Sequence, residues 1–84
     1  MTDEQEILVT SRGRLFRLCK SGVQRSLIGI SPERVAKYGV EIHGQEYPIR
    51  QVVAKATNTP KIEWTTANAY RILKNLGFEV QIYE

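Results

Sequence analysis

The clearest pattern of hydrophobic and polar positions lies in the second half of the chain. After Pro48, apolar residues recur at spacings i, i+3, i+4 and i+7, namely at Ile49, Val52, Val53 and Ala56. Polar residues take the other side of the same segment, at Arg50, Gln51 and Lys55. This spacing predicts an amphipathic helix of about two turns that begins near Pro48, a residue well suited to the first turn of a helix.

A second segment repeats the helical spacing at Ala69, Ile72, Leu73 and Leu76. The two helices are expected to be separated at residues 58–60, because Pro60 disfavours helix at the residue before it. Thr65 or Thr66 can cap the second helix, and Gly77 is the natural residue to follow its last turn. The connection between the helices is longer than the three or four residues of a helix-turn-helix motif, so that geometry is not predicted.

Strand patterns flank the two helices. Residues 78–83 alternate apolar and polar side chains, which predicts a half-buried strand at the end of the chain. Apolar residues on both sides of residues 43–45 predict a small hairpin that turns near Gly44. The final strand is expected to pair with this hairpin, so that one sheet covers both helices.

The sequence pattern of the first forty residues predicts secondary structure less clearly. Residues 7–10 are β-prone and residues 11–14 have the composition of a turn. Residues 15–20 either alternate as the second arm of a hairpin or form a helical stripe that stops at Gly22, and the hairpin is slightly favoured. Ser31-Pro32-Glu33 combines a cap, a proline and an acid, which predicts a short helix from Pro32 to about Tyr38.

These elements predict an α+β fold: a small single domain with β-hairpins, a pair of amphipathic helices and a C-terminal strand. With 84 residues and an apolar fraction of 42%, the chain has room for one domain, residues 1–84, with residues 1–6 as a flexible acidic tail. A core of this size gives a thin margin of stability, which leaves room for a homodimer or a larger partner.

Charge is spread unevenly along the chain, although the net value is only +3. Five basic residues come without an intervening acid, and we take them as candidate phosphate contacts: Arg12, Arg14, Arg17, Lys20 and Arg25. The alternative is a solvated basic face that serves solubility. Secondary candidates lie on the two predicted helices: Arg50, Lys55, Arg71 and Lys74. Asn68 and Asn75 accompany the last two on the outward side of the second helix. Trp64 and Tyr70 are expected in the core or as lids on it, rather than as stacking platforms.

Candidates for catalysis are few. The single histidine, His43, has no second histidine, cysteine pair or carboxylate cluster beside it, and the single cysteine, Cys19, follows apolar Leu15 and Leu18. We therefore expect neither an enzyme, nor a metal site, nor a cofactor. The acidic N-terminus and the lack of a long apolar run predict a cytoplasmic protein without signal peptide or membrane span.

One stretch of the chain resembles a known family. Residues 47–57 begin Tyr47-Pro48 and open a helix, Glu63-Trp64-Thr65-Thr66 opens the next helix, and Leu76-Gly77-Phe78-Glu79-Val80 enters a strand. In this order, residues 47–80 resemble the N-terminal head domain of McrA-type modification-dependent restriction endonucleases. The resemblance implies a related fold and a DNA-associated module of bacterial or phage origin.

Two functions therefore stand side by side. The first is a non-enzymatic nucleic-acid-binding module, with DNA as the expected partner and a basic face as its contact surface. The second is a small protein-interaction module, such as an inhibitor or regulator from a defence system or mobile element, that binds through exposed apolar surface or a β-edge.

Overall fold

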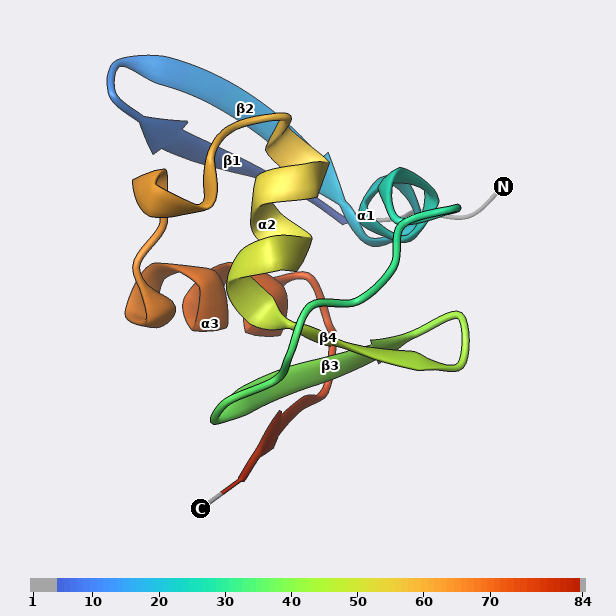
Figure 1. Cartoon of the computed structure of the whole chain (residues 1–84). Helices are drawn as coiled ribbons and strands as arrows, with labels where there is room; N and C mark the ends of the chain where they lie inside the picture. Colours follow the sequence, from blue (N-terminus) through green and yellow to red (C-terminus); the bar gives the residue numbers. More distant parts are fainter. Residues whose placement is uncertain (1–4, 84) are drawn as a thin grey trace.

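Two antiparallel sheets and three α-helices make up residues 5–83, the part of the chain that the computed structural model describes (Figure 1). In chain order the elements are β1 (Glu6–Ser11), β2 (Arg14–Cys19), α1 (Lys20–Ser26), β3 (Tyr38–Ile42), β4 (Gln45–Pro48), α2 (Ile49–Thr57), the 3-10 helix η1 (Lys61–Glu63), α3 (Thr66–Asn75) and β5 (Val80–Ile82). This arrangement confirms the predicted α+β class.

The N-terminal sheet is a hairpin of β1 and β2. The two residues between the strands, Arg12 and Gly13, have φ angles of 52° and 76°, as a tight turn of type I′ requires. The hairpin prediction for residues 15–20 is therefore confirmed through Cys19, whereas Lys20 already begins α1. β1 starts at Glu6, the last residue of the expected acidic tail, and residues 1–4 of that tail lie outside the described residues.

The second sheet has the strand order β4-β3-β5, with both pairings antiparallel. Its turn lies at His43 and Gly44, where the φ angles are 55° and 76°, which confirms the predicted hairpin. β5 pairs with β3 in the register Val40 to Val80, which confirms the predicted pairing of the C-terminal strand with this hairpin, although the strand spans Val80–Ile82 rather than residues 78–83. One face of this sheet packs on the helices, and the other faces outward.

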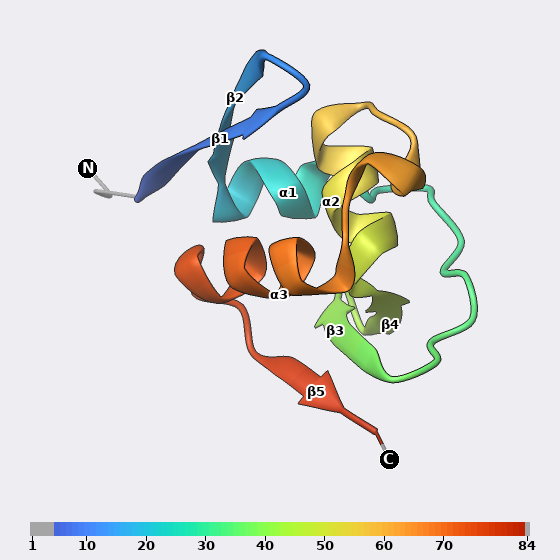
Figure 2. The same ribbon diagram turned by 90° about the vertical axis from the view of Figure 1, so that its left-hand side faces the viewer.

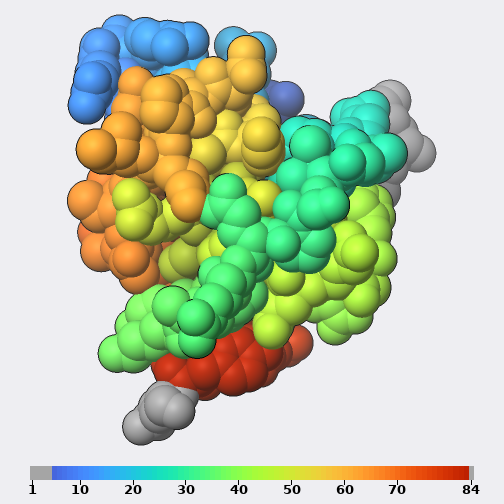
Figure 3. Space-filling view, in the orientation of Figure 1, coloured from blue at the N-terminus to red at the C-terminus, as the bar shows by residue number. Residues whose placement is uncertain are grey.

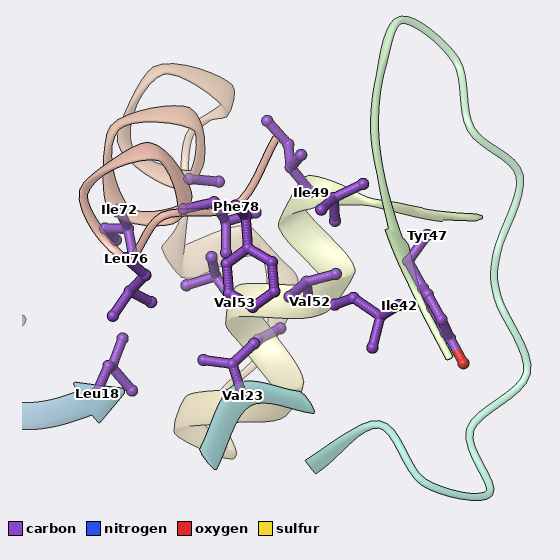
Figure 4. Close-up of a cluster of buried hydrophobic side chains, with 14 of the residues drawn as sticks. Leu18, Val23, Ile42, Tyr47, Ile49, Val52, Val53, Ile72, Leu76 and Phe78 are labelled. Carbon is purple, nitrogen blue, oxygen red and sulfur yellow. The ribbon is translucent and has the colours of Figure 1, made fainter. Parts of the chain in front are cut away.

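The core lies between α2, α3 and the inner face of this sheet, and Leu18 of β2, Val23 of α1 and Leu27 after α1 complete it (Figure 4). Every apolar residue of the two predicted stripes is buried except Ala56, which is half-buried. Trp64 is 2% exposed, as expected for a core residue, and its indole Nε1 donates to Thr59 Oγ1 at 2.7 Å. The ring of Phe16 from β2 meets it edge-on, with centroids 6.1 Å apart, so the N-terminal hairpin is packed on the same core.

The ends of α3 follow the predicted signals. Thr65 is the N-cap, and its Oγ1 accepts a hydrogen bond from Asn68 N at 3.1 Å. At the other end Gly77 has a φ of 96°, and Phe78 N donates to Leu73 O at 3.0 Å. This 6→1 bond completes a Schellman motif, which requires the left-handed conformation that glycine adopts without strain.

The region between α1 and β3 differs from the predicted structure. The predicted helix from Pro32 to Tyr38 is wrong, because residues 31–37 are irregular and lie across the surface of the molecule (Figure 3). The reason is a buried side chain of α2: Gln51 accepts a hydrogen bond from Glu33 N at 2.9 Å and donates to Ser31 O at 3.0 Å. These bonds take up backbone groups that a helix would use for itself. The helix in this half of the chain, α1, was not predicted.

Candidate nucleic-acid interface

The exposed side of α3 carries a group of hydrogen-bonding side chains. The helix buries Ala69, Ile72 and Leu73 and therefore turns the opposite side to solvent. We call this surface the α3 face, formed by Asn68, Arg71, Lys74 and Asn75, all of which are exposed. In Figure 2, α3 runs across the front of the molecule, with the β1–β2 hairpin above it and β5 below. Within residues 5–83, neither Arg71 nor Lys74 forms an ion pair or a side-chain hydrogen bond.

A groove of about 580 Å³, the tyrosine groove, separates α3 from β5. Its lining residues are Tyr38, Thr66, Ala67, Tyr70, Arg71, Lys74, Asn75 and Ile82. The rings of Tyr38 and Tyr70 meet edge to face, with centroids 5.8 Å apart and an interplanar angle of 65°. Both tyrosines are half-buried, so this groove combines an aromatic wall with a rim of two basic side chains and one amide.

A second groove of about 270 Å³, the strand groove, lies on the other flank of α3. It is lined by Ile7, Leu8, Val9, Thr10, Trp64, Asn68, Arg71, Ile72 and Asn75. Arg71 therefore borders both grooves. Among the described residues, no carboxylate lines either one.

The arginines of the hairpin do not share one face. Arg14 lies on the same side of β2 as Phe16, and its guanidinium carbon stands 5.1 Å from the centre of that ring. Arg17 lies on the other side, directly opposite Leu8 of β1. Arg12 occupies the turn, and its Nε is 4.0 Å from Glu63 Oε1. These three candidates therefore point in different directions, although all three are exposed.

The other two members of the basic run lie on α1. Lys20 Nζ donates to Gly77 O at 3.3 Å and stands 5.2 Å from the centre of the Phe78 ring, so it holds the start of α1 against the end of α3. Arg25 is exposed in the last turn of α1, where a cation complements the helix dipole. The five candidates are thus spread over the hairpin and α1 and do not converge on a single pocket.

The secondary candidates on α2 differ from those on α3. Arg50 donates from Nε to Trp64 O at 2.7 Å and from Nη2 to Lys61 O at 3.2 Å, so its guanidinium fastens η1 to the body of the protein. Lys55 is exposed but lines neither groove. Of the nine basic candidates, only Arg71 and Lys74 border a groove beside α3.

Carboxylates gather on a different part of the surface. Glu41 and Glu46 lie directly opposite each other on β3 and β4, on the face of the sheet that is turned away from the helices. Tyr83 donates a short hydrogen bond from its hydroxyl to Glu46 Oε2. This hydrogen bond, with the nearby carboxylates, raises the pKa of Tyr83 above 10.0. Within residues 5–83, two other carboxylates form ion pairs with basic side chains, Glu33 with Lys61 and Glu63 with Arg12.

The two residues considered for catalysis, His43 and Cys19, lie at the ends of strands. His43 sits in the β3–β4 turn with its Nε2 2.7 Å from Gln24 O, which ties the turn to α1. Cys19 is half-buried at the end of β2. Across residues 5–83, no three of the histidine, cysteine, aspartate and glutamate side chains come together as a metal site would require. None of the described helices is long and apolar enough to cross a membrane.

Two parts of this region were not anticipated. The sequence predicts a helix that ends at about Tyr38, so it does not predict the contact between Tyr38 and Tyr70. No sequence pattern indicates that β1 borders α3. The alternation of residues 78–83 is the one pattern that could have indicated Ile82 as a groove residue.

Comparisons with known proteins indicate the family to which the chain belongs. Neither the curated proteins nor the solved structures contain a significant match to this sequence. A family model described as SCO5918-like matches residues 10–84, a range that includes β2, all three α-helices and both grooves in large part. The chain therefore belongs to the SCO5918-like family.

Proposed function

We propose that this domain is a non-enzymatic nucleic-acid-binding module and that the α3 face is its contact surface. The observation that carries the proposal is the chemistry of that face: a free arginine, a free lysine and two asparagines between two grooves that no described carboxylate lines. Arginine and lysine bind phosphates, and asparagine amides bond to base edges or sugars.

The distribution of charge supports the same surface. Glu41 and Glu46, which form no ion pair within residues 5–83, lie on the outward face of the sheet, whereas Arg71 and Lys74 lie on α3. A polyanion approaching the protein is therefore drawn toward the helix side, where releasing its counterions favours binding. The exposed arginines of the β1–β2 hairpin add to this field without belonging to one contact face.

The tyrosine groove adds a preference for unpaired nucleotides. A base that enters the groove meets the rings of Tyr38 and Tyr70, while Arg71 and Lys74 at the rim are placed for its phosphate. Base–aromatic stacking contributes about 1–3 kcal/mol per base and requires a base that is free of its duplex stack. We therefore expect single-stranded oligonucleotides to bind more tightly than duplex at equal salt.

The resemblance of residues 47–80 to McrA-type head domains supports DNA as the nucleic acid, since this stretch includes all of α3. It also supports a bacterial or phage origin, with the cytoplasm as the compartment in which such DNA is met.

The test is a titration of labelled single-stranded and duplex DNA, followed by fluorescence anisotropy at several salt concentrations. The double variant Arg71→Gln/Lys74→Gln should bind more weakly, and the slope of log affinity against log salt should fall by about 1.4 for single strands if both side chains contact phosphate. The matched control is Arg25→Gln/Lys55→Gln, which removes the same charge from positions that line neither groove.

Two results would contradict the proposal. In the first, the wild-type domain binds neither form of DNA, nor RNA, at low salt, which rules out nucleic-acid binding altogether. Alternatively, the control variant loses as much affinity as the α3 variant, which indicates attraction by net charge with no local site.

A further inference from the structure

The strand groove is bordered by the edge of β1 rather than by one of its faces. Side chains of a strand alternate between two faces, yet four consecutive residues, 7–10, line this groove. Among the residues that the structure describes, this sheet has two strands, so no strand from that part of the chain pairs with the side of β1 away from β2. The residues that line the other side of the groove include Asn68, Arg71, Ile72 and Asn75 of α3. A backbone edge and a helix thus form the two walls.

The register of the hairpin identifies the backbone groups that face the groove. In a two-residue turn the flanking residues, Ser11 and Arg14, form a hydrogen-bonded pair, and bonded and non-bonded pairs then alternate along the ladder. Leu8 and Thr10 fall at the non-bonded positions. Their N–H and C=O groups therefore point away from β2, and within residues 5–83 no hydrogen bond to them from outside the hairpin is found.

The two edges of the hairpin differ in how they are protected. Exposed edges in native proteins are usually guarded by charged residues or proline, because an open edge pairs with other chains. β2 carries Arg14 and Arg17, whereas β1 reads Ile-Leu-Val-Thr-Ser after Glu6 and has neither a basic residue nor a proline. Leu8 is also 63% exposed. The edge that faces α3 is therefore the one suited to pairing.

We propose that the strand groove binds an extended segment of a partner protein, which adds to β1 as a third strand and pairs with Leu8 and Thr10. This is β-strand addition, in which backbone hydrogen bonds give affinity and alternate side chains give specificity. The asparagine amides of α3, at Asn68 and Asn75, can both donate and accept, so they match the other edge of the added strand.

The lining of the groove specifies the chemistry of the segment. Side chains that point inward meet Trp64 and Ile72, which favours apolar residues at alternate positions. Side chains that point outward lie near Leu8 and its cross-strand neighbour Arg17, with Arg71 on the opposite wall. Since no described carboxylate lines the groove, acidic residues at these positions complement its charge. The fitting partner is a segment that alternates apolar and acidic residues.

The α3 wall argues for a single strand as the occupant. A second copy of this chain would bring its own two-stranded hairpin to the edge of β1. The far side of the groove is lined by Asn68, Arg71 and Asn75, so a sheet that extends from β1 meets α3 on that side.

The proposal is tested with a synthetic eight-residue peptide of alternating valine and glutamate, added to the whole domain. Amide hydrogen exchange followed by NMR should show the Leu8 and Thr10 amides exchanging freely in the domain alone and at least tenfold more slowly with saturating peptide. Val9 is bonded to Phe16 within the hairpin and should change little. A peptide of alternating valine and lysine should bind at least tenfold more weakly.

A pair of matched variants tests whether the peptide binds at the edge of β1 or at the edge of β2. Leu8→Pro removes an outward N–H from the edge in the groove, and Leu15→Pro removes one from the opposite edge of the hairpin. Both leucines are exposed, at 63% and 66%, and both occupy non-bonded positions, where proline spares the β1–β2 ladder. We expect Leu8→Pro to lose at least tenfold in peptide affinity and Leu15→Pro to stay within twofold.

Three results would overturn the proposal. In the first, neither peptide slows hydrogen exchange at the Leu8 and Thr10 amides, even at the highest concentration used. In the second, these amides become protected without peptide as the protein concentration rises, which assigns the edge to a second copy of the chain. In the third, both proline variants bind like the wild type. If Leu8→Pro does not fold, the exchange measurement on the wild-type domain decides alone.

Discussion

Replacing Gln51 by alanine should loosen the segment between α1 and β3 and destabilise the whole domain. The side chain is 3% exposed and bridges this segment to α2 through two hydrogen bonds, from Glu33 N at 2.9 Å and to Ser31 O at 3.0 Å. Each bond contributes about 0.5–1.5 kcal/mol net, so the pair gives about 2 kcal/mol. For a domain of this length, that loss lowers the melting temperature by about 8–16 °C.

Thermal unfolding followed by circular dichroism measures the loss, and amide exchange locates it. The Glu33 amide should exchange much faster in Gln51→Ala, while amides in α3 keep their relative protection. Gln81→Ala is a suitable control, because Gln81 is exposed on β5 and none of the described side-chain hydrogen bonds involves it. An unfolding free energy within about 0.5 kcal/mol of the wild type would refute the reasoning, since surface substitutions alone change stability that little.

Three further predictions concern the core, a helix end and pH. Leu73→Ala empties a site that is 0% exposed and should cost about 2–5 kcal/mol in chemical denaturation; a loss below about 1 kcal/mol would mean that the stripe is not tightly packed. Gly77→Ala should cost about 1 kcal/mol through its φ of 96° alone, because an added Cβ meets nothing within 4 Å; an unchanged melting temperature would contradict this. Because the pKa of Tyr83 is raised, the stabilisation from its bond to Glu46 is complete below pH 10.0 and is lost as the pH rises through the raised pKa. An ultraviolet titration compared with Tyr83→Phe should show this shift, and Glu46→Gln should reduce it; an unshifted phenol would oppose the assignment.

Elements with a strong local pattern were predictable from the sequence. α2 and α3 follow from apolar spacing, and their ends follow from Pro48, Thr65 and Gly77. Short-range chemistry decides these features, so no knowledge of distant residues is needed. The two hairpins were likewise predictable, because glycine turns and alternating side chains are local signals.

The helix α1 and the segment after it were not predictable for opposite reasons. α1 has only seven residues, contains Gly22 and buries Val23 alone, so it lacks a stripe that a periodicity search can detect. The segment at residues 31–37 has a good capping signal, but Gln51, many positions later in the chain, satisfies its backbone in an irregular conformation. Tertiary hydrogen bonds outweighed local propensity there.

For the basic candidates, the sequence could predict which side chains are exposed, but not which of them are already engaged in hydrogen bonds within the protein. Arg71 and Lys74 follow from helical spacing as outward residues, and they are free in the described part of the chain. Arg50 and Lys20 have the same composition signal, yet each donates to backbone carbonyl groups distant in the sequence. A guanidinium or ammonium group that fastens two elements has fewer donors left for a ligand.

The surroundings of α3 show how a small fold can give one helix two different binding environments. One wall of the strand groove comes from β1 at the beginning of the chain, and one wall of the tyrosine groove comes from Tyr38 and β5. β1 and Tyr38 are distant in sequence from the residues of α3 that they face, so chain topology brings them to the helix, whereas β5 follows α3 after only four residues. Arg71 borders both, which means that a phosphate on one side and an acidic segment on the other would draw on the same guanidinium. The two proposed ligands are therefore distinguished by features that the grooves do not share. The tyrosine groove offers aromatic rings to a base, and the strand groove offers an open backbone edge to a strand.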